Sequence, residues 1–303
     1  MLLQRTIASW KLRTRSLELG RRTLIMGVVN ITPDSFSDGG DFLSPDAAVA
    51  RCMQCLDEGA DLLDLGAEST RPGAQAGNKE PRVSAEEEQN RLLPVVEGIL
   101  KLRPDAVVSA DTYKASTARA ALTAGVEIIN DVSGFTWDEA MPAVCAQSGS
   151  GVVLMHTRGR PDEWRAQSKL GADALIESVR VGLSESLATA TRSGIAPESI
   201  VLDPGYGFGK KFDENYALLA RQSELLALGR PLLAGLSRKS FLGHTLAGLH
   251  GGIQASVEAR ETAGIAALVT AILHGVSIVR VHQVRPAVEA ARIADAVLDA
   301  QRP

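Results

Sequence analysis

The segment Ala106-Val-Val-Ser-Ala-Asp-Thr-Tyr-Lys-Ala-Ser-Thr-Ala-Arg-Ala-Ala-Leu-Thr-Ala-Gly-Val-Glu-Ile-Ile-Asn-Asp131 contains one complete unit of a repeating pattern. Apolar, β-branched residues predict strands over 106–111 and 126–131, and a 3.6-residue periodicity predicts a helix over 115–124 between them. Gly125 follows that helix, where a C′ glycine belongs. Two strands joined by a helix favour an α/β fold with a parallel sheet.

The same alternation of strand and helix continues in both directions along the chain. It contains eight apolar segments, which are nearly continuous and therefore indicate a sheet covered on both faces. A single (β/α)8 TIM barrel domain over residues 1–303 is the simplest closed arrangement, because no linker-like or low-complexity stretch divides the chain. The predicted strands are Leu24–Asn30, Asp61–Gly66, Ala106–Asp111, Val126–Asp131, Gly151–His156, Ile200–Gly205, Pro231–Ser237 and Ser277–His282, and the predicted helices include Pro45–Glu58, Ala85–Leu102, Ala115–Ala124, Ala172–Ser193, Tyr216–Leu228, Glu258–His274 and Pro286–Asp299.

The segment before the first strand has a different pattern. Residues 10–19 alternate apolar with polar side chains, which predicts a short N-terminal β-ribbon that closes the bottom of the barrel. The first 22 residues are basic but lack the apolar core and small-residue cleavage site of a secretory signal. No apolar run approaches the ~20 residues that span a bilayer, so we expect no membrane association.

Composition restricts the partners further. The chain has 32 Lys and Arg against 36 Asp and Glu, and a net charge of -4 gives no global positive field for nucleic acid. Three cysteines, Cys52, Cys55 and Cys145, are an odd number, which argues against a disulfide framework and for the cytoplasm. Because the Cys52-x-x-Cys55 motif lies inside a predicted helix, we expect it to serve packing.

Polar side chains accumulate where the predicted strands end. In a (β/α)8 barrel the carboxyl ends of all strands meet at one face, which is where active sites are built. A packed barrel has no need for a ring of hydrogen-bonding groups at one end, so this ring predicts a ligand site. Its candidate members are Asn30, Glu68, Thr70, Arg71, Asp111, Asn130, Asp131, His156, Asp203, Ser237, Arg238, Lys239, Ser240, Arg280 and His282.

The charges of this ring differ between its two sides. The last two strands end in Ser237-Arg-Lys-Ser and Arg280-Val-His, where barrels frequently bind phosphate, so we expect anionic substrate groups there. The acceptors and the amide of Asp111, Asn130 and Asp203 suit a neutral heterocycle that carries N–H donors, such as an aminopyrimidinone. The long loops after the first two strands, residues 31–40 and 68–80, are candidate lids.

The segment Met26-Gly-Val-Val-Asn-Ile-Thr-Pro-Asp-Ser-Phe-Ser-Asp-Gly-Gly resembles the first signature of the dihydropteroate synthases. Further segments resemble that family in the same order along the chain, from about residue 24 to 282. They are Asp64-Leu-Gly-Ala-Glu-Ser-Thr-Arg-Pro-Gly, Asp111-Thr-Tyr-Lys, Ile129-Asn-Asp-Val-Ser-Gly, Met155-His, Asp203-Pro-Gly-Tyr-Gly-Phe-Gly-Lys, Gly235-Leu-Ser-Arg-Lys-Ser-Phe and Arg280-Val-His.

The resemblance implies a transferase that joins p-aminobenzoate to 6-hydroxymethyl-7,8-dihydropterin diphosphate and releases diphosphate. It also implies Mg²⁺ held between Asn30 and the diphosphate, a homodimer, and closure of the two long loops over the site. The implied catalytic residues are Asp111, Lys239 and Arg71. The implied pterin ligands are Asp111, Asn130, Met155, Asp203 and Lys239, the diphosphate ligands are Asn30, Thr70, Arg71, Arg280 and His282, and the p-aminobenzoate pocket consists of Phe36, Pro72, Gly207, Phe208 and Ser240.

Three positions depart from the family pattern: Ala110, Lys211 and Gln283. Gln283 replaces an acid that usually follows the Arg-Val-His segment, which bears on how diphosphate is held. Two alternatives remain open at this point. A methyltetrahydrofolate-binding corrinoid methyltransferase would share the Asp and Asn ring but has no use for a diphosphate site, and a non-catalytic relative would bind the pterin without turnover.

Overall fold

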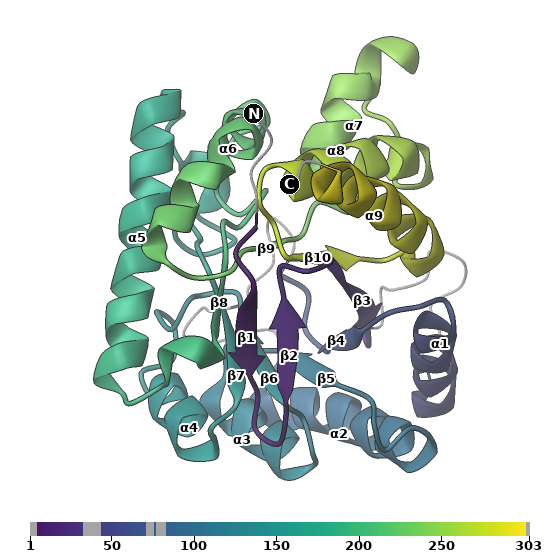
Figure 1. Cartoon of the computed structure of the whole chain (residues 1–303), viewed down its shortest axis with the longest axis vertical. Coiled ribbons are helices and arrows are strands. Elements are labelled where there is room, and N and C mark those ends of the chain that lie inside the picture. Colours follow the sequence, from purple (N-terminus) through teal and green to yellow (C-terminus); the bar gives the residue numbers. More distant parts are fainter. Residues whose placement is uncertain (1–4, 33–43, 71–75, 77–82, 301–303) are drawn as a thin grey trace.

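The computed structural model, described for residues 5–32, 44–70, 76 and 83–300, contains an eight-stranded parallel sheet in these ranges (Figure 1). The strand order is β8-β7-β6-β5-β4-β3-β10-β9, and a bridge between Leu202 and Leu232 joins the two edge strands. The predicted (β/α)8 barrel is therefore confirmed. Its strands are β3 Leu24–Asn30, β4 Leu62–Gly66, β5 Val108–Asp111, β6 Ile128–Asp131, β7 Gly151–Met155, β8 Ile200–Asp203, β9 Leu233–Ala234 and β10 Ile278–Val281.

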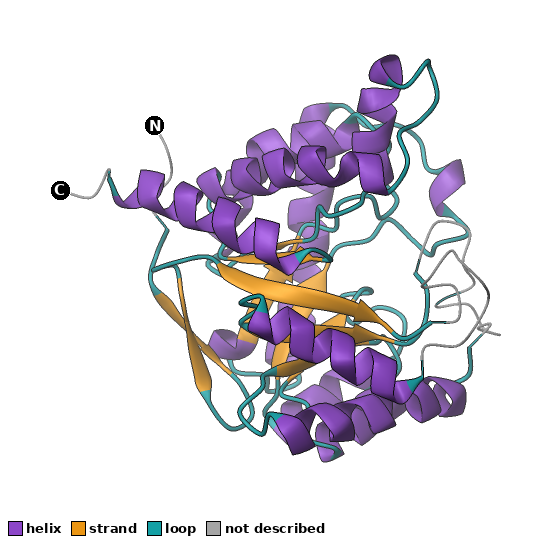
Figure 2. Cartoon of the chain, turned by 90° about the vertical axis from the view of Figure 1, so that its right-hand side faces the viewer, coloured by secondary structure: helices purple, strands orange, loops and turns teal. Residues whose placement is uncertain are grey.

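Helices surround the strands on the outside of the barrel, as Figure 2 shows. The predicted helices are present with small shifts at their ends, except that the second half of predicted 216–228 is the 3-10 helix η3 and predicted 258–274 begins with the 3-10 turn η5. The α-helices are α1 Pro45–Asp57, α2 Ala85–Leu102, α3 Ala115–Thr123, α4 Met141–Ser148, α5 Ala172–Arg192, α6 Glu214–Arg221, α7 Ser240–Thr245, α8 Glu261–Leu273 and α9 Val284–Asp299, and the 3-10 turns are η1 Trp164–Ala166, η2 Pro197–Ser199, η3 Gln222–Leu228, η4 Leu246–Leu249 and η5 Glu258–Arg260.

Two elements differ from the sequence prediction. The predicted strand 231–237 is wrong in length, since only Leu233–Ala234 forms a ladder, with β10, and Leu232 adds a single bridge to Leu202. Pro231 has no amide hydrogen for a ladder, and the backbone reaches a left-handed conformation at Arg238, with φ 62°. Helix α4 is absent from the predicted set, because its apolar residues do not gather on one side and so show no helical periodicity.

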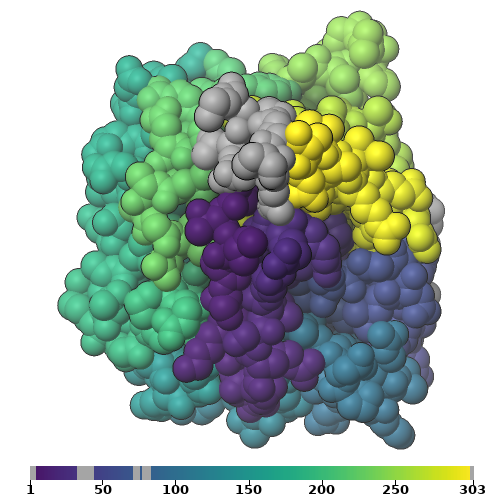
Figure 3. Space-filling model, in the orientation of Figure 1, coloured from purple at the N-terminus to yellow at the C-terminus, as the bar shows by residue number. Residues whose placement is uncertain are grey.

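The N-terminal ribbon closes the amino-terminal end of the barrel. Strands β1, Ala8–Lys11, and β2, Ser16–Leu19, pair antiparallel. Trp10, Leu12 and Leu19 pack in one cluster with side chains from inside the barrel, and the Trp10 indole donates to the backbone oxygen of Ser199 at 2.9 Å. In the space-filling view of Figure 3 the ribbon covers the centre of this face. The predicted closure of the barrel bottom by this ribbon is confirmed, and the ligand site is expected at the opposite end, where the strands have their carboxyl ends.

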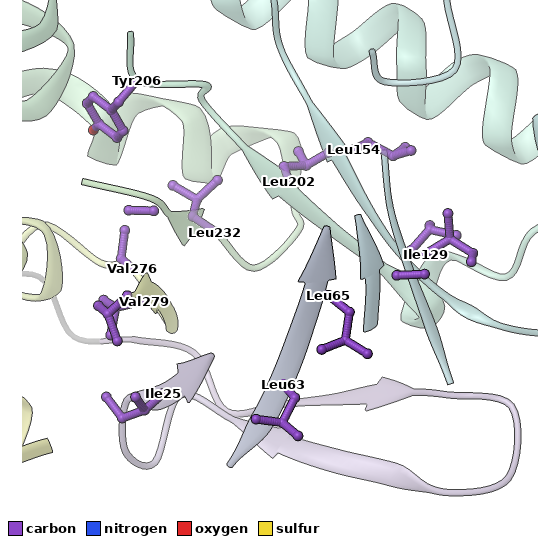
Figure 4. Close-up of a cluster of buried hydrophobic side chains, with 14 of the residues drawn as sticks. Ile25, Leu63, Leu65, Ile129, Leu154, Leu202, Tyr206, Leu232, Val276 and Val279 are labelled. Atoms are coloured by element: carbon purple, nitrogen blue, oxygen red, sulfur yellow. The ribbon is translucent and has the colours of Figure 1, made fainter. Parts of the chain in front are cut away.

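Successive side chains of each strand point alternately to the apolar core outside the barrel and to the barrel interior. Leu63 and Leu65 of β4 point outward and belong to the main core between strands and helices, which Figure 4 shows around Leu154 and Leu202. The alternate residues of each strand therefore face the interior. Among the described residues, no helix combines the length and apolar character needed to cross a membrane.

Candidate active site

A set of hydrogen-bonded polar side chains occupies the barrel interior on the carboxyl-terminal side of the apolar cluster that contains Trp10 and Leu19. Asp64 alternates with Leu63 and Leu65 along β4, so it points inward, where its side chain is fully buried. Its carboxylate accepts from Arg280 Nε at 2.6 Å, Ser109 Oγ at 2.6 Å and Asn130 Nδ2 at 3.1 Å.

The guanidinium of Arg280 joins this network to a second carboxylate. Arg280 Nη2 donates to Asp111 Oδ2 at 2.6 Å, and both side chains are one-fifth exposed. We call Asp64, Ser109, Asp111, Asn130 and Arg280 the cup. The cup combines β4, β5, β6 and β10, so residues more than 200 positions apart form one site.

Burial and mutual charge set the protonation of the cup. Burial raises the pKa of Asp111 to about 7, while the nearby Arg280 opposes this rise and Asp64 adds to it. Burial would lower the pKa of Arg280, but the carboxylates of Asp64, Asp111 and Asp203 raise it above its ordinary value. Arg280 therefore stays charged, and Asp111 can gain or lose a proton near neutral pH.

Lys239 and Asp203 lie on the side of the cup formed by β8 and the loop after β9. Lys239 Nζ lies 4.0 Å from the centre of the Phe208 ring, and a Cβ placed on Gly207 would be 3.4 Å from Lys239 Cδ. Burial lowers the pKa of Lys239 to about 8, although the neighbouring Asp203 acts in the opposite direction. Asp203 is itself buried and accepts from the Gly205 amide at 2.7 Å.

Asn30 and His282 mark the rim on the side of β3 and β10. A Cβ placed on Gly66 would be 3.6 Å from both Asn30 Oδ1 and Asp111 Oδ2, so these side chains flank one glycine. His282 Nδ1 lies 3.1 Å from Ser237 Oγ at the end of the loop after β9. The amide of Asn30 thus lies beside the cup and the imidazole of His282 beside the loop after β9, and their role in holding an anion stays a prediction.

A cavity of ≈ 680 Å³ opens next to Lys239 on the outer side of the loop after β8. Gly207 and Ser240, both predicted for a p-aminobenzoate pocket, line it together with Lys211, Phe212 and His244. Helix α7 begins at Ser240 but has only six residues.

Two predicted members of the ring point elsewhere. His156 follows Met155 at the end of β7 and faces helix α5, where a Cβ on Gly182 would be 2.6 Å from its ring. Asp131 accepts from the backbone amides of Ser133 and Phe135 and so shapes the loop after β6. Both assignments to the ring are wrong, because each residue lies one position beyond an inward-facing neighbour and has the opposite parity.

The structure also places the remaining candidates. Met155 packs with Tyr113 and Val132 and touches the turn at Gly205, and Thr70 follows Glu68 in the loop after β4. Three predicted site residues, and the greater part of both candidate lids, lie outside the described residues. These three are Phe36, Arg71 and Pro72.

A second buried charge network was not predicted. Lys114 Nζ donates to Glu68, and to Glu88 Oε2 at 3.0 Å, and all three side chains are at most 9% exposed. Thr117 Oγ1 also donates to Glu88. The network joins the loop after β4 to helices α2 and α3, and a buried-facing Glu within the apolar pattern of α2 was the available sequence signal.

Comparison with known proteins agrees with this geometry. The family model described as pterin binding enzyme matches residues 26–282. The dihydropteroate synthase of Mycobacterium leprae is 43% identical, over 91% of this chain and 94% of that protein. The solved Xanthomonas albilineans dihydropteroate synthase with 4-aminobenzoic acid is 37% identical, with a TM-score of 0.84 over 98% of this chain and 100% of that one.

The chain belongs to the pterin-binding enzymes, which matches a barrel with an Asp and Asn cup at its carboxyl end. Within that family it is a member of the dihydropteroate synthases. A further structure of the Xanthomonas enzyme, in complex with 7,8-dihydropteroate, is 35% identical, with a TM-score of 0.79 over 97% of this chain and 100% of that one.

Proposed function

We propose that this chain condenses p-aminobenzoate with 6-hydroxymethyl-7,8-dihydropterin diphosphate to give 7,8-dihydropteroate and diphosphate. The observation that carries the proposal is the cup itself, in which Arg280 bridges the carboxylates of Asp64 and Asp111 at 2.6 Å each. One cation and several hydrogen-bond acceptors lie within one interior space. That space can hold a heterocycle rich in N–H donors next to an anionic group.

The pterin ring is assigned to the deep side of the cup. Asp111 and Asn130 present acceptors on the adjacent strands β5 and β6, and Asp203 presents another on β8, next to Met155 of β7; Met155 and Lys239 supply apolar surface beside them. A buried acceptor that meets no donor is costly, so these side chains select a ring edge with N–H groups.

The diphosphate is assigned to the rim, where Asn30, Thr70, Arg280 and His282 would bind it together with Arg71. The described residues contain no group of three or more His, Cys, Asp and Glu side chains that could hold a metal. An Mg²⁺ ion that arrives with diphosphate needs only one or two protein oxygens, and Asn30 Oδ1 beside Asp111 fits that requirement. When bound, Mg²⁺ would neutralise charge on the departing diphosphate.

The reaction forms a C–N bond and breaks a C–O bond at the pterin methyl carbon. The amine of p-aminobenzoate supplies the electron pair and later loses a proton, and diphosphate leaves with the pair of the broken bond. If the C–O bond breaks first, positive charge spreads into the pterin, and the ionised Asp111 would stabilise it. This route requires no side-chain nucleophile.

The ≈ 680 Å³ cavity beside Lys239 is assigned to p-aminobenzoate. Gly207 lines this cavity, and both Gly207 and Phe208 approach Lys239 at the side of the cup. Ser240 and the positive side chain of Lys211 are near enough to the cavity to attract a carboxylate. Phe36 and Pro72 lie outside the described residues, so their place in the p-aminobenzoate pocket stays a prediction.

The proposal is tested by measuring dihydropteroate and diphosphate in parallel from the two substrates with and without Mg²⁺. We expect one diphosphate for each dihydropteroate formed, and no product without either substrate. A protein that binds the pterin diphosphate but releases no diphosphate is a binding protein, and this outcome would refute the proposal. Transfer of a methyl group from methyltetrahydrofolate to a corrinoid would instead support the methyltransferase alternative.

A homodimer in the cytoplasm is the proposed state of the protein. Leu249 is 82% exposed and Ile253 is 74% exposed, and helix α8 is apolar on most sides. Such a surface favours association with a second copy. The three cysteines are buried free thiols, as expected in a reducing compartment. Light scattering after gel filtration should give twice the chain mass, and Ile253→Glu should give the single-chain mass.

A further inference from the structure

Asp64 is the most buried carboxylate of the cup and the one with the most partners. Its side chain has no exposed surface, and one oxygen accepts from Ser109 while the other accepts from Asn130 and Arg280. An ionised carboxylate can only accept hydrogen bonds, so each of these partners must turn a donor toward it. Asp64 therefore dictates how two ligand-facing groups are oriented.

The first of these groups is the amide of Asn130. Because Asp64 Oδ2 can only accept, the Nδ2 of Asn130 must be the atom 3.1 Å away, and Oδ1 must point elsewhere. Without Asp64 the amide could rotate by 180° at little cost. The carboxylate thus fixes Asn130 with its acceptor directed away from the floor of the cup.

The second group is the guanidinium of Arg280. Asp64 binds Nε, the nitrogen nearest the backbone, and leaves the outer nitrogens available to Asp111 or to a ligand. A guanidinium held by Nε keeps one plane, whereas a free arginine side chain samples many. Asp64 therefore acts on both ends of the proposed substrate without lying at the surface of the cup.

We infer that Asp64 is a positioning residue that orients Asn130 for the pterin ring and Arg280 for the diphosphate. This assignment rests on the proposed function for the identity of the two ligands. The competing interpretation is a buried charge that only stabilises the fold. The two differ in one respect: a positioning role couples ring binding to diphosphate binding through a single side chain.

The test uses two probes that each contain one half of the substrate. They are 6-hydroxymethyl-7,8-dihydropterin, and inorganic diphosphate with Mg²⁺, each titrated into the whole protein by calorimetry. Asp64→Asn should weaken both by about 10- to 100-fold, as loss of a supporting partner typically does. Asn130→Ala should weaken mainly the ring, and Arg280→Met mainly diphosphate.

Ring selectivity supplies a readout that a change in stability does not move. The wild-type protein should prefer the 2-amino ring to its 2-oxo analogue, because Asn130 presents an acceptor. In Asp64→Asn that preference should fall by about threefold or more, since the amide is then free to rotate. An unchanged preference in this variant would count against the orienting role.

Asp295→Asn is the matched control. Asp295 also accepts from a buried arginine, Arg5 at 2.5 Å, and from Thr23, but it lies on α9 near the amino end of the barrel. It should lower the unfolding temperature while leaving both dissociation constants within about twofold. If Asp295→Asn weakened both probes as Asp64→Asn does, or if Asp64→Asn weakened neither, the inference would be wrong.

Ser109→Ala covers the case in which Asp64→Asn does not fold. It removes only the 2.6 Å donor to Asp64 Oδ1, and we expect both probes to weaken by about three- to tenfold. Unchanged binding of both would contradict the inference. Because these titrations need no turnover, they remain informative even if the synthase assay of the wild-type protein fails.

Discussion

Replacement of Arg280 by methionine tests the balance of charges within the cup. Methionine keeps an apolar stem of similar length but removes the cation that lies 2.6 Å from Asp64 and from Asp111. Asp64 would then remain fully buried with only the neutral donors Ser109 and Asn130. Removal of one partner from a buried pair costs about 3–5 kcal/mol. We take about 3 kcal/mol, because one-fifth of Arg280 is exposed and water can partly replace it.

This free energy corresponds to a measurable change in thermal stability. At roughly 2.1 cal/mol/K for each of 303 residues, the unfolding entropy is about 0.64 kcal/mol/K, so 3 kcal/mol lowers Tm by about 5 °C. The measurement is calorimetric unfolding of both proteins at pH 8; the pKa of Asp111 is about 7 in the wild type, and loss of Arg280, which lowers that pKa, would raise it further in the variant. The double variant Asp64→Asn/Arg280→Met should regain about half of that loss or more, since the fully buried charge of Asp64 is then gone and only Asp111, which is one-fifth exposed, lacks its cation.

The double variant decides between two accounts of the same loss. If Arg280→Met destabilised through lost packing alone, Asp64→Asn would add its own cost and Tm would fall further. A Tm for Arg280→Met within 1 °C of wild type would refute the charge argument altogether. Additive losses in the double variant would do so as well.

Three further predictions concern protonation, backbone and thiols. Burial raises the pKa of Asp111 to about 7, and its ionised form is the proposed electrostatic group. The value of kcat/KM should therefore fall about tenfold for each pH unit below pH 7. A flat profile from pH 8 to pH 5 would contradict this role. Gly205→Ala should abolish folding, because φ is +71° and a Cβ would lie 1.9 Å from the His156 carbonyl oxygen. Gly149→Ala, at φ +65° with nothing within 4 Å of the added Cβ, should cost only about 1–2 kcal/mol in denaturant unfolding. Equal losses in the two variants would refute the steric argument. Burial raises the pKa of Cys52 to about 12, so iodoacetamide should leave it unmodified by mass spectrometry in the native protein at pH 8 and label it in urea; labelling without urea would show that the thiol is accessible.

Periodicity predicted the barrel because strand and helix alternate without interruption in an apolar chain. The boundaries of β3 and α2 are as predicted, since each has an unambiguous pattern over its whole length. Short elements are harder to predict from the sequence. Only two residues of the predicted strand 231–237 form a ladder, with a single bridge from Leu232, and no sequence pattern states how far a ladder extends once the barrel has closed.

The sequence predicts the candidate site residues that lie at strand ends, but it does not single out those that lie within strands. Asp111 and Asn130 are conspicuous because polar residues end their apolar strands. Asp64 lies in the middle of β4, and its importance depends on Arg280, which is 216 residues away and reaches it only in the closed barrel. His156 was placed in the ring because it ends a strand, but a shift of one residue turns it toward α5.

The ion pairs within the cup limit how the proposed substrate can bind there. Arg280 is already bound to two carboxylates, so a diphosphate that binds this guanidinium must compete with one of them. Asp64 is fully buried and has two further donors, whereas Asp111 is one-fifth exposed and has a raised pKa, so Asp111 is the weaker competitor. Release of Asp111 from Arg280 would leave its side chain beside the pterin while diphosphate occupies the rim, and would raise the pKa of Asp111, since Arg280 holds that pKa down, until positive charge develops on the ring. The same guanidinium would thereby connect binding of the leaving group with exposure of the charge that stabilises its departure.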